Sequence, residues 1–225
     1  MNSLKLKSTA DGSSTIYNEL LDEHYHSIYG AIQESLHVFI KMGLSYFLQS
    51  NPLKNEYSIL ELGFGTGLNC ILSLLHNFNS EKKIYYNTVE PYILNLDTIK
   101  NLNFNLSEND LIFFEKIHLL NWEKEHEVHH NFFLSKFNTD FNSFKTNDSY
   151  DIIYFDAFAP RKQPHLWTFK VFEKIFNMTK RNGILVTYCA KGQVRRDLES
   201  VGFNVERLVG PPGKREMIRA LKKEN

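Results

Sequence analysis

The residues best suited to chemistry in this sequence surround a glycine-rich turn. Residues 59–69 read Ile-Leu-Glu-Leu-Gly-Phe-Gly-Thr-Gly-Leu-Asn, an apolar strand that runs into three alternating glycines and then a helix with an apolar face. Glycines let the backbone approach a ligand closely, and free N–H groups at a helix start favour a polar or anionic group. The turn therefore predicts a cofactor cradle. Its predicted contacts are Glu61, Gly63, Gly65, Thr66, Gly67 and Asn69.

An acidic residue before the turn separates this cradle from a dinucleotide site. Glu61 stands two positions before the first glycine, whereas the dinucleotide pattern G-x-G-x-x-G serves to hold a pyrophosphate. A carboxylate at this position suits a ligand that carries positive charge, such as S-adenosylmethionine. Glu90 closes the next predicted strand, Ile84–Glu90, where a carboxylate would bind ribose hydroxyls.

A second chemical motif follows the apolar run Tyr150–Phe155. Residues 156–167 read Asp-Ala-Phe-Ala-Pro-Arg-Lys-Gln-Pro-His-Leu-Trp. A carboxylate, small residues, an aromatic ring and a proline just past a strand end can form a rigid wall that holds a planar base and an amine. The alternative is a purely structural role, in which Pro160 and Pro164 only shape a loop. We predict that Asp156 lies at the cofactor and is the catalytic group, which captures and orients an acceptor amine.

S-adenosylmethionine is a methyl donor, and methyl transfer from it to an amine needs a free lone pair on the amine nitrogen. A primary alkylamine has a pKa of about 10.4 and is mostly protonated at neutral pH. Proton acceptance is a secondary role for Asp156 in this interpretation, because a nearby carboxylate favours the ammonium form. The other candidate proton relays are Tyr29, Tyr188, His24 and His26.

The elements that must position these residues alternate between strand and helix patterns. Helix patterns at Phe169–Met178, closed by Asn182-Gly183, and at Val194–Val201 separate apolar strand runs, which predicts an α/β fold with a mostly parallel sheet. Ligands bind beyond the carboxyl ends of such strands, so the acids at or just past strand ends should converge on one crevice. Those acids are Glu61, Glu90, Asp140 and Asp156. The further strand runs are Ile84–Val89, Phe132–Phe137, Ile184–Tyr188, Phe203–Leu208 and Met217–Leu221.

The chain is most simply one structural unit of two parts. Residues 1–50, with a helix-like run from Ala31 to Leu48, form an N-terminal extension predicted to pack on the active-site side, and residues 51–225 form the catalytic domain. Residues 101–130 are predicted to hold a helix and an extra strand or hairpin. Two cysteines exclude a disulfide framework, and no metal site is predicted. No signal peptide or membrane-spanning run is present, which favours a cytoplasmic protein without a membrane partner.

Charge is distributed unevenly although the formal net charge is zero. Residues 161–225 hold 15 of the 26 Lys and Arg but 6 of the 26 Asp and Glu. A basic region of this kind suits a phosphate backbone, although solvated helix faces would explain it equally well. The phosphate candidates are Lys162, Arg195, Arg196, Lys214 and Arg215, and the base-stacking candidates are Phe158 and Trp167. Trp167 could equally be a core residue.

Together these motifs resemble the methyltransferase domain of the bacterial MnmC family. The resemblance rests on residues 63–69, on Asp156–Pro160 with Lys162, Pro164 and Trp167, and on Gly192–Arg196 with Gly213–Met217. Residues 22–27, 30–35 and 37–39 resemble the stand-alone form called MnmD. The resemblance covers nearly the whole chain.

The resemblance implies a Rossmann-like methyltransferase fold with seven strands, the last antiparallel, flanked by helices. It implies S-adenosyl-L-methionine as cofactor and tRNA as partner, with methylation of 5-aminomethyl-(2-thio)uridine at the wobble position to the 5-methylaminomethyl form. The chain ends at Asn225, so we expect no oxidase activity of the kind found in two-domain members. We expect functional coupling to a separate oxidase and to the enzymes that install the aminomethyl group.

One position departs from the family pattern, and two other functions stay open. Thr139-Asp140 stands where the family has Gly-Asp, which retains the acid expected at the adenine but puts the backbone turn in doubt. A small-molecule amine methyltransferase would not need the basic C-terminal third. A non-catalytic nucleotide- or RNA-binding subunit would not need the Asp156 loop.

Overall fold

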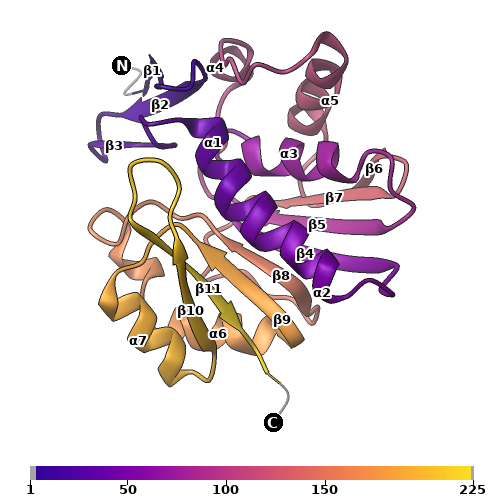
Figure 1. The fold of residues 1–225 in the computed structure, drawn as a ribbon. Coiled ribbons are helices and arrows are strands. Elements are labelled where there is room, and N and C mark those ends of the chain that lie inside the picture. Colours follow the sequence, from indigo (N-terminus) through magenta and orange to yellow (C-terminus); the bar gives the residue numbers. More distant parts are fainter. Residues whose placement is uncertain (1–3, 224–225) are drawn as a thin grey trace.

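The computed structural model describes residues 4–223, which form an eight-stranded sheet, covered by helices, and a small second sheet (Figure 1). The strand order of the large sheet is β10-β11-β9-β8-β4-β5-β7-β6. Five neighbouring strands in it are parallel, as predicted. These strands are β7 (Phe132–Phe137), β5 (Lys83–Val89), β4 (Glu56–Leu62), β8 (Tyr150–Phe155) and β9 (Thr179–Thr187).

The two edges of the large sheet contain its antiparallel pairs. On one edge β11 (Glu216–Leu221) runs antiparallel to β9 and to β10 (Asn204–Val209), so the antiparallel last strand is confirmed. On the other edge β6 (Glu125–His129) forms an antiparallel pair with β7. The prediction of seven strands was therefore wrong by one, and the additional strand comes from the segment in which a helix and an extra strand were expected.

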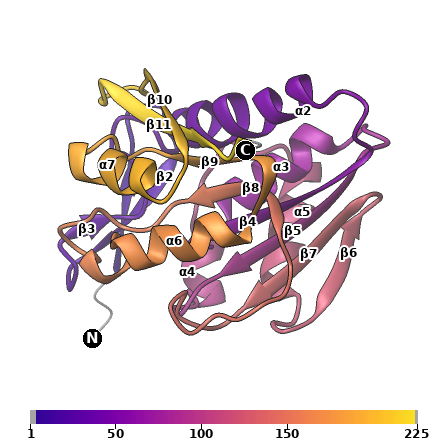
Figure 2. The same cartoon turned by 90° about the horizontal axis from the view of Figure 1, so that it is seen from below.

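Helices cover both faces of the large sheet (Figures 1 and 2). On one face lies a continuous helix made of α1 (Ala31–Ser35), the π-helix η1 (Leu36–Ser45) and α2 (Tyr46–Ser50), beside α3 (Leu68–Asn77) and α5 (Glu108–Leu119). On the other face lie α6 (Phe169–Met178) and α7 (Gly192–Ser200). The short α4 (Leu96–Lys100) and a 3-10 turn, η2 (Pro164–Leu166), complete the helices of the described chain.

Side-chain alternation along the strands explains why both faces are covered. In β4, Ile59 is buried in the core beneath α3, whereas Leu60 and Leu62 are buried in the core beneath α6. In β8, Tyr154 and Phe155 divide between the two cores in the same way. Strands that bury both faces need helices on both sides, which is the reason for the nearly continuous apolar runs in the sequence.

One predicted turn lies inside a strand instead. Asn182-Gly183 was expected to close the helix Phe169–Met178, but β9 begins at Thr179, directly after that helix. Asn182 has a φ of 59°, and the register between β8 and β9 shifts beside Tyr150 and Ile152. The pair therefore belongs to an irregularity near the start of β9, because a residue in the left-handed region interrupts a strand without ending it.

The small sheet was not predicted. It consists of β1 (Leu4–Ser8), β2 (Ser14–Asn18) and β3 (Glu23–His24), all antiparallel. The amide of Ser14 donates to the carbonyl of Asn103 at 2.7 Å, which attaches the small sheet to the segment after α4. Figure 1 shows it beside the carboxyl ends of the large sheet. Among residues 4–223, no helix is both long and apolar enough to cross a bilayer.

Candidate active site

The predicted convergence of strand ends is present in the structure. Leu62 at the end of β4 is in register with Val89 at the end of β5 and with Phe155 at the end of β8. Backbone hydrogen bonds continue one residue further, from Gly63 N to Val89 O at 3.0 Å and from Asp156 N to Leu62 O at 3.1 Å. The next residues of the three strands, Gly63, Glu90 and Asp156, therefore lie side by side at the same edge of the sheet.

The glycine turn needs glycine for conformation and for space. Gly63 has a φ of 95°, and a Cβ placed on it would lie 2.9 Å from the carbonyl oxygen of Asp156. Gly67 has a φ of 75° at the start of α3, and its Cβ would lie 2.8 Å from His118 Nε2. Side chains at these positions would clash, so the turn is confined to backbone that a ligand can approach closely.

Glu90 holds the turn and faces the cavity beside it. Its carboxylate accepts hydrogen bonds from the amide of Gly65 at 3.0 Å and from the amide of Tyr92 at 2.7 Å. Burial raises the pKa of Glu90, and these two amide donors counteract part of the increase. Each carboxylate oxygen keeps acceptor capacity, so Glu90 can still bind the hydroxyls of a ribose.

Glu61 lies beneath the turn instead of in the cavity wall. It is fully buried, and neither carboxylate oxygen has a hydrogen-bond partner among the described residues. Burial raises its pKa to about 8, although the nearby polar side chains of Thr88, Asn69 and Tyr86 lower it somewhat. At neutral pH the group is therefore mostly neutral. Protonation supplies a donor beside Asn69 Oδ1, which is also unpartnered.

Asp156 is another carboxylate that lines the cavity, beside the glycine turn. Asn69 Nδ2, from the first turn of α3, donates to its Oδ2 at 2.8 Å. Burial raises the pKa of Asp156 well above its usual value, and the charges of Glu34 and Glu61 add to that increase. Asn69 and Lys214 act in the opposite direction. The site thus concentrates acids whose charged forms need a cationic partner.

The cavity has a volume of about 760 Å³, within the range of roughly 300–1,000 Å³ usual for small-molecule sites. The cradle and the ends of β5, β7 and β8 form one side, and the N-terminal segment and the β10–β11 loop form the other. Of the predicted cofactor and RNA contacts, those that line the cavity are Gly63, Gly65, Thr66, Asn69, Glu90, Asp140, Asp156, Phe158, Lys162 and Lys214, and the four candidate proton relays line it as well.

Asp140 reaches the cavity without the glycine that was expected before it. Its Oδ1 accepts from the amide of Asn142 at 2.8 Å, which stabilises the turn after β7. Thr139 has no positive φ. The backbone here therefore accommodates threonine, and the departure from the family pattern leaves the acid in position.

Tyr25 and Glu34 belong to the site but were not predicted from the residues. The Tyr25 ring lies over Gly65, where a Cβ would be 3.2 Å from it, and it meets the ring of Phe158 edge to face at 4.9 Å. Glu34 is buried in α1, pairs with Lys214, and accepts from the amide of Ser27 at 2.9 Å. Contacts between segments far apart in the sequence place these two residues. Local patterns therefore gave no signal beyond the family resemblance of residues 22–27 and 30–35, which contain them.

Hydrogen bonds hold the loop after Asp156, and its tryptophan packs against the core. Trp167 is 8% exposed, packs edge to face on Phe155 at 4.6 Å, and donates its indole N–H to the carbonyl of Phe158 at 2.8 Å. Gln163 accepts from the amide of Phe158 at 2.9 Å. Trp167 is therefore a core residue that supports the loop, as the alternative prediction had it, and its buried ring is not available to stack on a base. Phe158 remains half-buried in the cavity wall.

The five basic candidates occupy different environments. Lys162 pairs with Asp22 at 3.1 Å, and Arg195 pairs with Glu199 at 3.0 Å within α7. Arg196 is exposed and donates to Gln193 at 2.8 Å. Lys214 is half-buried, with its ammonium 4.4 Å from the centre of the Tyr188 ring. Arg215, next to it, is exposed and outside the cavity wall.

The candidate proton relays are partly occupied. His26 Nε2 forms a hydrogen bond with Thr66 Oγ1 at 2.6 Å, and burial lowers its pKa to about 4. His24 packs on Tyr17 at 4.9 Å. Tyr188 donates its hydroxyl to the carbonyl of Ala157 at 2.8 Å, whereas Tyr29 is 55% exposed at the cavity mouth. No group of three or more metal-ligating side chains occurs in residues 4–223.

These residues fit the predicted cofactor, S-adenosylmethionine. The cradle offers backbone that a Cβ would block, Glu90 offers a carboxylate for a ribose, and Asp140 lies in the same wall. The orphaned Glu61 carboxyl beneath the turn can ionise when a cationic ligand lies above it. A dinucleotide would instead bring a pyrophosphate towards two buried acids, Glu61 and Glu90, and the half-buried Asp156.

Comparisons with known proteins agree with this geometry. The family model of S-adenosyl-L-methionine-dependent methyltransferases matches residues 118–223. Over its full length the chain superposes on the crystal structure of MnmC2 from Aquifex aeolicus with a TM-score of 0.81 and 28% sequence identity, and it covers 72% of that protein.

Curated relatives give the same picture from sequence. The tRNA 5-methylaminomethyl-2-thiouridine biosynthesis bifunctional protein MnmC of Leptospira interrogans is 28% identical over 91% of this chain, and that of Actinobacillus pleuropneumoniae is 26% identical over 97%. The chain spans 33% and 35% of the length of these two relatives. An uncharacterized protein of Methanocaldococcus jannaschii is 28% identical over 98% of the chain, which covers 60% of it.

Proposed function

Because the chain is an S-adenosyl-L-methionine-dependent methyltransferase related to MnmC, we propose that it methylates the amino nitrogen of 5-aminomethyl-(2-thio)uridine at the wobble position of tRNA. The observation that carries this proposal is Asp156, a half-buried carboxylate that faces the cavity level with the glycine turn. Its position suits an alkylamine held beside the methyl donor.

Asp156 can both orient the amine and accept its proton. In a buried site an ammonium–carboxylate pair and a neutral amine–carboxylic acid pair differ by the transfer of one proton, and a low dielectric favours the neutral pair. The raised pKa of Asp156 acts in the same direction. The structure therefore supports a larger role in proton acceptance than the sequence suggested, while Asn69 fixes the orientation of the carboxyl group.

The reaction itself is a displacement in line. S-adenosylmethionine supplies a methyl group on a positively charged sulfur. With that donor bound, the nitrogen lone pair would form the new N–C bond while the electron pair of the C–S bond stayed on sulfur, and the amine proton would pass to Asp156. The protein's contribution is alignment, because a misplacement of about 1 Å can lower the rate by about a hundredfold.

The opposite wall of the cavity supplies charge balance. Lys214 pairs with Glu34 and lowers the pKa of Asp156. The pair adds no net charge, so it orients polar groups at the acceptor without repelling a cationic amine. We propose that the first 50 residues, which contribute Glu34 and Tyr25, act as the acceptor side of the site.

We propose that tRNA approaches over this wall. Arg215 and Arg196 are exposed for phosphate contacts, and Lys162, Arg195 and Lys214 can exchange their present partners for phosphates. Phe158 and the exposed Tyr29 are suited to contacts with bases. The substrate requires a preceding reaction that installs the aminomethyl group or an oxidase that exposes it, so functional coupling to such enzymes belongs to the proposal.

The test is methyl transfer from labelled S-adenosylmethionine into total tRNA from cells that lack the modification, followed by nucleoside mass analysis. We expect one labelled nucleoside, 5-methylaminomethyl-(2-thio)uridine. Transfer to free amines but not to tRNA would indicate a small-molecule methyltransferase. Binding of cofactor and tRNA without any transfer would indicate a non-catalytic subunit.

A further inference from the structure

A buried lysine lies behind the glycine turn, outside the cavity. Lys136 in β7 is 1% exposed, and it stands in the same cross-sheet row as Thr88 and Glu61. Lysine is rarely buried to this extent without a carboxylate partner. Within residues 4–223, no carboxylate lies at ion-pair distance from Lys136, so its ammonium has another role.

The ammonium of Lys136 binds the end of a helix. Its Nζ donates to the carbonyls of Ile117 and His118 at 2.7 and 3.2 Å, where α5 ends and its last carbonyls have no helical partner. It also lies 4.8 Å from the centre of the Trp122 ring and 5.6 Å from that of Phe64. Burial lowers the pKa of Lys136 to about 8.

The residue at that helix end contacts the turn. His118 Nε2 donates to the carbonyl of Thr66 at 3.1 Å, and its ring packs on Phe64 at 5.3 Å. Burial lowers the pKa of His118 to about 4, so it is neutral and carries its proton on Nε2. The same nitrogen occupies the space that a Cβ on Gly67 would need. The backbone of the turn is thus held from behind.

We propose that Lys136 and His118 are positioning residues that hold the glycine turn in its cofactor-binding shape. Lys136 fixes the last turn of α5, the helix end fixes His118, and His118 fixes the backbone at Thr66 and Gly67. Neither side chain lines the main cavity. This inference depends on the cofactor site and not on the identity of the methyl acceptor.

Another lysine in the chain gives a matched control. Lys222 donates to the carbonyls of Phe176 and Thr179 at 2.7 and 2.8 Å at the end of α6, and it lies 4.4 Å from the centre of the Phe176 ring. Lys222 is half-buried and Lys136 fully buried, but both ammonium groups bind the last carbonyls of a helix beside an aromatic ring. Helix α6 covers the other face of the sheet, away from the turn. Loss of a helix-end lysine can therefore be separated from loss of the support to the turn.

The experiment compares Lys136→Met with Lys222→Met in the full chain. We measure calorimetric affinity for S-adenosylhomocysteine and hydrogen exchange of the amides of residues 63–68 in the ligand-free protein. Lys136→Met should weaken binding by about tenfold, as expected for a lost charge-assisted hydrogen bond, and should speed exchange in the turn. Lys222→Met should change neither. Equal effects of both variants, or no effect of Lys136→Met, would overturn the proposal.

A second pair of variants keeps the test decisive if Lys136→Met does not fold. His118→Gln retains an N–H donor at a similar reach, whereas His118→Leu does not. We expect His118→Gln to keep cofactor affinity near that of the unmodified protein, and His118→Leu to lose several-fold. Equal affinity in the two variants would show that the contact with Thr66 does not position the turn.

Discussion

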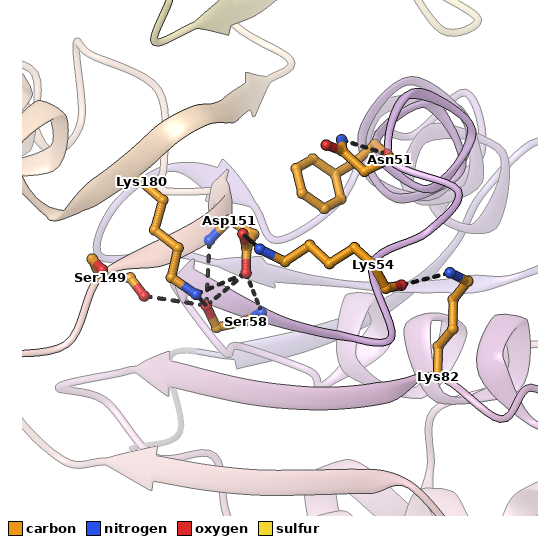
Figure 3. Close-up of polar contacts among 8 residues, drawn as sticks. Asn51, Lys54, Ser58, Lys82, Ser149, Asp151 and Lys180 are labelled. Atoms are coloured by element: carbon orange, nitrogen blue, oxygen red, sulfur yellow. Dashed lines mark hydrogen bonds and ion pairs between the residues drawn. The ribbon is translucent and has the colours of Figure 1, made fainter. Parts of the chain in front are cut away.

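Carboxylates at the two ends of the central sheet differ in their polar partners and in the direction in which their pKa values shift. At the amino end of β8, Asp151 is 2% exposed, and its carboxylate is bound by Lys54 at 2.6 Å and Lys180 at 2.9 Å (Figure 3). The amide of Ser58 also donates to it at 2.9 Å. Burial alone would raise the pKa of Asp151, but these partners outweigh it and the pKa is lowered.

At the carboxyl end of the same strands, Glu61 is fully buried and Asp156 is half-buried in the cavity wall, and both are poorly partnered. Glu61 has no hydrogen-bond partner in the described chain, Asp156 has one from Asn69, and the pKa of each is raised. A buried charge without a partner is destabilising. The difference indicates that Asp151 at the amino end stabilises the fold. We propose that Glu61 and Asp156 at the carboxyl end gain their partners when ligands bind.

The largest expected effect concerns the amino end. Asp151→Ala removes the shared partner of Lys54 and Lys180 and should lower the free energy of unfolding by about 3 kcal/mol, as for a broken buried ion pair. Because the pKa of Asp151 is lowered in the folded state, its contribution is complete at neutral pH and is lost as the pH falls. Chemical denaturation at pH 7 and at acidic pH measures this.

The control for that prediction is cofactor affinity in folded Asp151→Ala, which should match that of the unmodified protein. A large loss of affinity at unchanged stability would show that the two ends are not separate in function.

At the carboxyl end, Asp156→Asn should fold normally and bind cofactor and tRNA, yet transfer methyl groups about a hundredfold more slowly. The asparagine keeps the shape but cannot accept a proton, and misalignment of the amine alone can cost this much. Single-turnover kinetics across a pH series measures it. A nearly full rate at every pH would transfer the role to Tyr29, Tyr188 or a histidine in the N-terminal segment.

Glu61→Gln should produce opposite effects on stability and binding. The pKa of Glu61 is raised to about 8 in the folded state. The fold therefore loses stability as the pH rises from the ordinary pKa of a glutamate in the unfolded chain towards 8, because the unfolded chain ionises first. The neutral glutamine should therefore raise the free energy of unfolding by about 1–2 kcal/mol at pH 8 or above, and by less at pH 6. The affinity for S-adenosylmethionine should fall. A variant that is less stable at high pH would contradict the comparison.

The smallest effect is expected in the exposed loop between β10 and β11, outside the cavity. Arg215→Ala should reduce the slope of log affinity against log salt for tRNA by about 0.7–0.9, the value of one phosphate contact, without changing cofactor affinity. Arg181→Ala, an exposed arginine in β9 near the amino end of the sheet, is the matched control and should leave the slope unchanged. Equal slopes for the two variants would place the tRNA elsewhere.

Local patterns in the sequence were sufficient for the central strands, the glycine turn and the acids at strand ends, because each depends on residues close together in the chain. The Rossmann-like methyltransferase fold, the enzyme class, the cofactor and the resemblance to MnmC are confirmed. The convergence of Glu90 and Asp156 followed from the parallel sheet alone.

Features that depend on distant contacts were missed or only loosely placed: an extra strand was expected somewhere in residues 101–130, without bounds, and the small N-terminal sheet was not expected at all. β6 is a polar edge strand without an apolar alternation, and the small N-terminal sheet pairs short strands that have little core of their own. Tyr25, Lys136 and the pair of Glu34 with Lys214 acquire their roles only when segments far apart in sequence meet. The burial of Trp167 likewise depends on Phe155 and Tyr188 from two other strand ends.

The most direct test of the comparison is the number of protons released when S-adenosylmethionine binds. Calorimetry at pH 7 in buffers of different ionisation enthalpy gives this number. Glu61 is mostly protonated in the free protein, with a pKa of about 8, and should ionise beneath the cationic ligand, so we expect release of close to one proton per bound molecule. Glu61→Gln should abolish that component. Binding without proton release, or with equal release from Glu61→Gln, would contradict the claim that the cationic ligand stabilises the ionised carboxylate of Glu61.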